Sequence, residues 1–250
     1  MGKTTTAVNL AASLSMAGKR TLLLDFDPQG NASSGVGFPK TSAQSNRGQS
    51  KPVGVLSAAL ASQGLQQFVQ PTQLPGLSVL PSSPDCSSLE LIQEVQERGI
   101  PKFREQVSAV SSAFDYVLID CPPSLGGLPT IALSVSHRVL VPIQCEYYAM
   151  EGLSQILPII HKLKQSINTV LEIEGLLLTM FACDLDLSVE VVREISDYFS
   201  DSVFQTIIPR DVVLAEAASH GVPAFEYAPL SRGAWSYLEL AKEVLSHDWS

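Results

Sequence analysis

The chain has 250 residues, of which 45% are hydrophobic and 16% are charged, and its formal net charge is −9. This size allows a sizeable buried core, and no apolar run of about 18 residues or more predicts a membrane span. The acidic balance disfavours general attraction to nucleic acid, although it leaves room for a local basic patch.

The four cysteines, Cys86, Cys121, Cys145 and Cys183, are scattered and form no CxxC pair. This spacing is typical of a reduced protein and gives no pattern for a zinc or iron–sulfur site. The N-terminus lacks the basic start and apolar stretch of a signal peptide. We therefore expect a reduced, cytoplasmic protein.

Short apolar runs alternate with amphipathic stretches, as in βαβ units with a parallel sheet. In chain order we expect a helix at 4–17, a buried strand at 21–25, a long polar loop at 31–53, a helix at 54–63, a strand at 77–80, helices at 87–98 and 101–113, strands at 116–120 and 137–142, a helix at about 150–166, a strand at 171–179, a helix at 188–199, a strand at 203–208, and helices at 211–219 and 232–246. This order predicts one doubly wound α/β domain over residues 1–250, with a mostly parallel sheet flanked by helices.

The start of the chain, Gly2-Lys3-Thr4-Thr5, matches the second half of a phosphate-binding loop. Such a loop works because backbone N–H groups at a helix N-terminus cradle anionic oxygens, while its lysine neutralises phosphate charge and its hydroxyl binds Mg²⁺. Because nothing precedes Met1, the full GxxxxGK[ST] pattern cannot be matched. We expect an N-terminally truncated form, from a misplaced start or a shortened chain.

Two further segments place carboxylates where such a site needs them. Asp25 and Asp27 follow the strand at 21–25, and Asp120 ends the strand at 116–120. In open α/β sheets, ligands bind at the carboxyl ends of the strands. One carboxylate of the first pair can meet a hydrated Mg²⁺ while the other orients the attacking water, and Asp120 is expected to act through water. The alternatives are a helix cap or a solvated acidic turn.

Cys121 follows Asp120 directly, but no activating base is visible beside it. We therefore expect a small buried residue at this position and not a nucleophile.

With these segments in order, the chain resembles the ParA/Soj family of deviant Walker A partitioning ATPases. The similarity runs nearly end to end and includes 2–12, 22–37, 115–126, 141–152, 175–180, 207–210, 216–217, 219–221 and 231–234. The resemblance implies a P-loop-like fold and an ATP-switched homodimer that hydrolyses ATP with Mg²⁺. It also implies nonspecific DNA binding by that dimer and a ParB-type protein that stimulates hydrolysis. A location in the bacterial cytosol or at the nucleoid is implied as well.

The resemblance also implies roles for individual residues. Lys3 corresponds to the phosphate lysine, with Gly2 and Thr5 beside it in the loop, and Thr4 supplies the magnesium-ligand hydroxyl. Asp27 corresponds to the water-positioning carboxylate, and Asp25 and Asp120 are the magnesium-side carboxylates. The Pro209-Arg210 segment is expected near the adenine.

This sequence departs from the family pattern at three places. The first strand and the Lys-Gly-Gly segment that precede Gly-Lys-Thr in the family have no counterpart here. Asp184 and Val213 stand where the family often has arginines associated with DNA contact. Because each lost phosphate contact weakens binding, we expect weakened DNA binding. The remaining basic candidates are Lys162, Lys164, Arg193, Arg210, Arg232 and Lys242.

Several other functions stay open. A MinD-type membrane regulator needs a basic amphipathic C-terminal helix, but Lys242 is the only Lys or Arg in 239–250, so no membrane partner is expected. A metabolic relative, such as an iron–sulfur reductase or an amide-forming ligase, lacks support from the cysteine spacing. A catalytically impaired interaction scaffold, or a positioner of protein cargo in place of DNA, remains an alternative.

Overall fold

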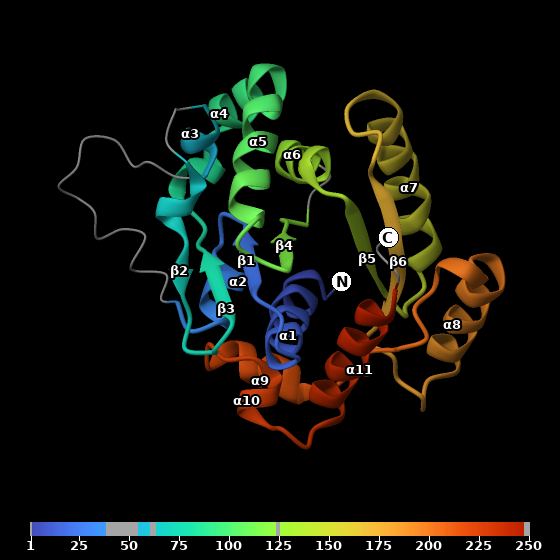
Figure 1. Ribbon diagram of the computed structural model, residues 1–250. Helices are drawn as coiled ribbons and strands as arrows, with labels where there is room; N and C mark the ends of the chain where they lie inside the picture. The colour runs from blue at the N-terminus through green and yellow to red at the C-terminus, as the bar shows by residue number, and fades with distance from the viewer. Residues whose placement is uncertain (1, 39–54, 61–63, 124–125, 248–250) are drawn as a thin grey trace.

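The computed structural model describes residues 2–38, 55–60, 64–123 and 126–247. Helices flank strands that lie near the middle of the molecule (Figure 1). The elements are α1 (Lys3–Met16), β1 (Thr21–Asp25), α2 (Asn31–Gly35), α3 (Val55–Leu60), η2 (Leu65–Phe68), β2 (Gln70–Pro71), β3 (Leu77–Leu80), η3 (Pro84–Ser87), α4 (Leu89–Glu94), η4 (Val95–Gly99), α5 (Ile100–Ser111), β4 (Tyr116–Asp120), α6 (Gly127–Val135), β5 (Arg138–Gln144), α7 (Ala149–Ser166), β6 (Glu172–Thr179), α8 (Asp186–Tyr198), η5 (Ser200–Ser202), α9 (Val212–Ser219), α10 (Ala224–Tyr227) and α11 (Arg232–Ser246).

The described strands form two hydrogen-bonded groups, ordered β2-β3-β1-β4 and β5-β6. β1 pairs in parallel with both β3 and β4, β5 pairs in parallel with β6, and the short β2 is antiparallel to β3. The mostly parallel, helix-flanked α/β architecture is therefore confirmed. The register sets Asp25 opposite Asp120, so both carboxylates end their strands at the same edge.

Helix α1 connects the two groups of strands. Leu10 and Leu14 on α1 belong to a buried cluster that also holds Leu177 of β6, with Leu118 of β4 and Leu140 of β5 packed against it. The burial of apolar side chains from both groups in one cluster stabilises their mutual placement.

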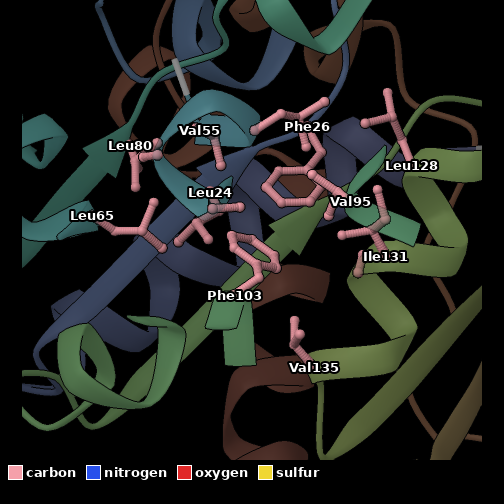
Figure 2. Close-up of a cluster of buried hydrophobic side chains, with 14 of the residues drawn as sticks. Leu24, Phe26, Val55, Leu65, Leu80, Val95, Phe103, Leu128, Ile131 and Val135 are labelled. Carbon is pink, nitrogen blue, oxygen red and sulfur yellow. The ribbon is translucent and has the colours of Figure 1, made fainter. Parts of the chain in front are cut away.

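A second cluster lies on the other face of β1 and is shown in Figure 2. Leu24 and Phe26 from the β1 segment meet Phe103 of α5, and the rings of Phe26 and Phe103 lie 5.7 Å apart at a tilt of 33°. Alternate residues of a strand face opposite sides of a sheet, so Leu23 packs instead in a cluster with Val8 and Ala11 of α1. The strand is buried on both faces, as its continuous apolar sequence predicts.

Part of the predicted loop at 31–53 is helical, which corrects that prediction. Residues 31–35 form α2, whereas 39–54 lie outside the described residues. Residues 31–35 include no large apolar residue, but Ala32 and Ser33 are buried and Gly35 packs against Val8. Tertiary contacts thus supply the helix with stability that its local composition does not indicate.

The predicted strand at 203–208 is also wrong, because its pairing to β6 is interrupted. The amides of Phe204 and Ile208 donate to β6 carbonyls, whereas those of Gln205 and Thr206 donate to the Glu243 carboxylate at 2.6 and 2.9 Å. Single bridges join Leu176 to Val203 and Phe181 to Pro209, so no continuous ladder forms here.

Other boundaries shift by a few residues. The helices predicted at 87–98 and 101–113 are joined through the π-helical turn η4, and α6 has no counterpart among the predicted elements. No helix in the described ranges has both the length and the apolarity needed to cross a membrane.

Candidate functional site

The N-terminus of α1 is built to receive an anion. Gly2 precedes the helix with φ 69° and ψ 11°, a left-handed conformation that glycine adopts without strain. No side chain caps the first turn, and no acidic residue lies in it. The free N–H groups and the positive end of the helix dipole therefore face outward for a negatively charged group.

A cavity of about 620 Å³ lies at this helix start. The sequence segments at 2–5, 27–31 and 121–123 meet around it, although they are far apart in the chain. Its lining consists of Gly2, Lys3, Thr4, Thr5, Asp27, Pro28, Gln29, Asn31, Cys121, Pro122 and Pro123. The structure thus brings the phosphate-loop residues and Asp27 together, as the sequence predicts.

Asp120 lies just behind this lining and is only 2% exposed. The Thr4 hydroxyl donates a hydrogen bond to its Oδ2 at 2.8 Å. Burial raises the pKa of Asp120 to about 7, and the nearby Asp25 and Asp27 charges add to this rise. The Thr4 hydrogen bond and the Lys3 charge act in the opposite direction. The site therefore holds a carboxylate that a cation would stabilise.

Lys3 shares this environment. Burial lowers the pKa of its ammonium group, while Asp120, Cys121 and Asp27 act to raise it. Burial also raises the pKa of the Cys121 thiol to about 12, so that its sulfur stays protonated at neutral pH. A protonated thiol is a poor nucleophile, which agrees with the expected structural role of Cys121.

Asp25 is fully buried, and its carboxylate accepts hydrogen bonds from the turn that follows β1 and from α2. Its Oδ1 accepts from the Asp27 amide at 3.1 Å, and its Oδ2 accepts from the amide and the hydroxyl of Ser33, both at 2.7 Å. Burial raises the pKa of Asp25, whereas the Ser33 hydrogen bonds oppose that rise. Asp27, 6% exposed, lines the cavity, and its Oδ1 accepts from the Gln29 amide at 2.9 Å.

Pro209 and Arg210 lie away from the cavity lining. The Arg210 guanidinium forms an ion pair with Glu146 at 2.8 Å, and the Arg210 amide donates to the Phe181 carbonyl. Neither residue lines the cavity, and their proximity to an adenine stays a prediction.

The sequence analysis missed several residues of the site. Pro122 and Pro123 line the cavity, and Ser33 and Ser82 support the Asp25–Asp27 turn. The two prolines directly follow Cys121, two and three residues after Asp120, so their position was a usable signal. The serines gave none, because their roles depend on contacts between distant segments.

The arrangement fits a nucleoside triphosphate with Mg²⁺. The uncapped helix start and Lys3 suit phosphate groups, and Thr4 with Asp120 offers oxygen atoms for a hydrated magnesium ion. Within the described ranges, no group of three or more His, Cys, Asp or Glu side chains could hold a metal by itself.

The raised pKa of Asp120 predicts a pH-dependent stability for the nucleotide-free chain. The folded value of about 7 lies above the ordinary value of 3.8, so between these values the folded state binds the extra proton. The free energy of unfolding should therefore fall as pH rises through this window and level off above it. Asp120→Asn should flatten this dependence and stabilise the chain at about pH 8, by up to about 4 kcal/mol.

Urea unfolding at several pH values checks this expectation. The exposed Asp201→Asn serves as the control and should leave the profile unchanged. Identical pH slopes for Asp120→Asn and the unsubstituted chain would contradict the burial argument.

Several known proteins are similar to this chain in sequence and in fold. The family model described as "AAA domain" matches residues 1–173. The chromosome partitioning protein ParA of Myxococcus xanthus is 42% identical over 99% of this chain and 85% of its own length. The sporulation initiation inhibitor protein Soj of Bacillus subtilis is also 42% identical, over 99% of this chain and 94% of its own.

A solved structure extends the comparison. Cobyrinic acid a,c-diamide synthase from Mycobacterium smegmatis, with bound ATP analog and magnesium, has a TM-score of 0.80 at 29% identity. The match covers 98% of this chain and 90% of the synthase chain. The greater identity lies with the partitioning proteins and extends along almost the whole chain. The chain belongs to the AAA domain family and, within it, to the ParA/Soj chromosome-partitioning ATPases.

Proposed function

We propose that this chain is a Mg²⁺-dependent ATPase that works as a partitioning switch. One observation carries the proposal: the uncapped start of α1, Lys3 and Asp27 line the same cavity. These are the three components that phosphoryl transfer to water requires: a phosphate cradle, a positive charge and a carboxylate able to orient the attacking water.

Each component has a defined part in the proposed reaction. The amides of the first turn and the Lys3 ammonium hold the phosphates and offset the charge that develops on them. Asp27, which lines the same cavity, orients the attacking water. Thr4, Asp25 and Asp120 would hold a hydrated Mg²⁺, which supplies further charge neutralisation when bound.

The wider cycle follows from the relatives. Proteins named ParA and Soj are 37–42% identical to this chain along almost its full length. We propose that residues 1–250 act as one nucleotide-binding domain, that ATP joins two copies, and that a ParB-type partner stimulates hydrolysis. Hydrolysis then works as a timer, because contacts held by the γ-phosphate are lost when it leaves.

Replacement of Asp27 tests the catalytic assignment. Asp27→Ala should retain ATP binding, with a Kd within about threefold, because the phosphate cradle is untouched. Turnover should fall about 100-fold or more, the usual contribution of a positioned general base or water-orienting group. Phosphate release and binding of a fluorescent ATP analogue provide the two measurements.

The exposed carboxylate of Asp197 on α8 offers a matched control, since Asp197→Ala should keep both values. Undiminished turnover in Asp27→Ala would remove Asp27 from its role. Absence of turnover in the unsubstituted chain, with binding retained, would favour the scaffold alternative.

DNA binding is the weakest part of the proposed cycle. Asp186, Glu190, Glu194 and Asp197 are exposed and, at spacings of four, four and three, they share one face of α8. Arg193 lies on the same helix among these carboxylates. A polyanion is repelled by such a face, so α8 is a poor DNA-binding surface.

The other basic candidates give a limited surface. Arg210 is paired with Glu146, and Lys242 is paired with Glu239 at 2.6 Å. Lys162, Lys164 and Arg232 form no ion pair within the described part of the chain. We propose two or three phosphate contacts in total, which gives weak nonspecific binding.

This estimate predicts the response to salt. Two or three phosphate contacts should reduce DNA affinity by about ten- to fiftyfold between about 50 and 200 mM salt. Fluorescence anisotropy with labelled duplex DNA and the ATP-bound chain measures this slope. The double replacement Glu190→Lys with Glu194→Lys should strengthen binding and steepen the slope. Tight binding that survives high salt would show that the basic surface has been underestimated.

A further inference from the structure

We propose that Ser33 and Ser82 are positioning residues that hold Asp27 in place through a closed ring of hydrogen bonds. The proposal rests on the proposed function, because it assigns to the ring the placement of the carboxylate that orients the attacking water. The two serines come from α2 and from the segment after β3, and they touch the turn from outside the cavity lining.

The Ser33 hydroxyl acts both as a hydrogen-bond donor and as an acceptor. It donates to Asp25 Oδ2 at 2.7 Å and accepts from the Ser82 amide at 3.1 Å. The Ser33 side chain is buried, and the residue is only 4% exposed. Water therefore offers little competition for these bonds, and a hydrogen bond to a buried carboxylate is stronger than one at the surface.

The Ser82 hydroxyl closes the ring by donating to the Asp27 carbonyl at 2.6 Å. On the other side of the Asp27 Cα, the Asp27 amide donates to Asp25 Oδ1 at 3.1 Å. The connections therefore run from Asp27 through Asp25, Ser33 and Ser82, and back to Asp27. Both backbone polar groups of Asp27 are engaged, which fixes the point from which its carboxylate reaches into the cavity.

Such a ring makes catalysis depend on residues that do not line the cavity. A shift of about 1 Å in a reacting group can reduce a rate by about 100-fold, whereas binding of the phosphates by α1 does not require the ring. Loss of either hydroxyl should therefore lower turnover and leave nucleotide affinity nearly unchanged. A purely structural role would instead affect binding, turnover and stability together.

Neighbouring Ser34 provides a matched control on the same helix. Among the described residues, its hydroxyl donates to the Asn31 carbonyl alone, within its own turn, at 3.1 Å. Ser34→Ala thus makes the same chemical change one residue away without breaking the ring.

The experiment compares Ser33→Ala, Ser82→Ala and Ser34→Ala by ATP turnover and by titration with a fluorescent ATP analogue. We expect kcat to fall about tenfold in the first two variants, about the loss that removal of one buried hydrogen bond produces. The Kd should stay within about twofold, and Ser34→Ala should match the unsubstituted chain. Ser33→Ala combined with Ser82→Ala should cost little more than either alone, since one break opens the ring. Ser33→Thr, which keeps a hydroxyl, should recover part of the rate.

Equal losses in affinity and turnover, or unchanged turnover in both Ser33→Ala and Ser82→Ala, would overturn the proposal. If the unsubstituted chain shows no turnover, the proposed function fails, but the ring is still tested in the nucleotide-free chain. There, Ser33→Ala and Ser82→Ala should each speed hydrogen exchange at the Asp27 amide, and Ser34→Ala should not. Unchanged exchange in both ring variants would overturn the ring.

Discussion

The pairing of β1 with β4 is the constraint on which the site depends. Its parallel register places Asp25 opposite Asp120, so two carboxylates are buried at one edge of the sheet. Buried charges of the same sign are costly unless other groups compensate them. Thr4 and Ser33 provide hydrogen bonds, and Lys3 provides a positive charge. These three groups therefore offset the cost of burying the two carboxylates. A bound cation would stabilise this edge of the sheet for the same reason.

The two carboxylates perform different tasks in this account. Asp120 turns toward α1 and is joined to the helix start through Thr4, whereas Asp25 turns toward α2 and organises the turn that carries Asp27. The cavity therefore has one wall set by the start of α1 and another set by the Asp25 turn. Because a separate set of contacts stabilises each wall, the account predicts that nucleotide binding and hydrolysis can be changed independently.

Much of this arrangement could be predicted from the sequence, because its signals are local. Continuous apolar runs predicted the strands at 21–25, 77–80 and 116–120 at their exact boundaries, and Gly2-Lys3-Thr4 marked the start of α1. The errors lie where distant contacts decide the conformation. Ser33 stabilises α2 through Asp25, and Glu243 takes two amides of the segment at 203–208 that would otherwise extend a ladder. No local pattern reveals either partner.

Binding of a fluorescent ATP analogue in the presence of Mg²⁺, with and without the Lys3 side chain, tests the central claim most directly. The account predicts saturable binding to this chain, its loss in Lys3→Ala because the phosphate charge is no longer neutralised, and its retention in Lys19→Ala. Lys19 is a suitable control because it follows the opposite end of α1, away from the cavity. Equal affinity in Lys3→Ala and the unsubstituted chain would contradict the assignment of the phosphate site.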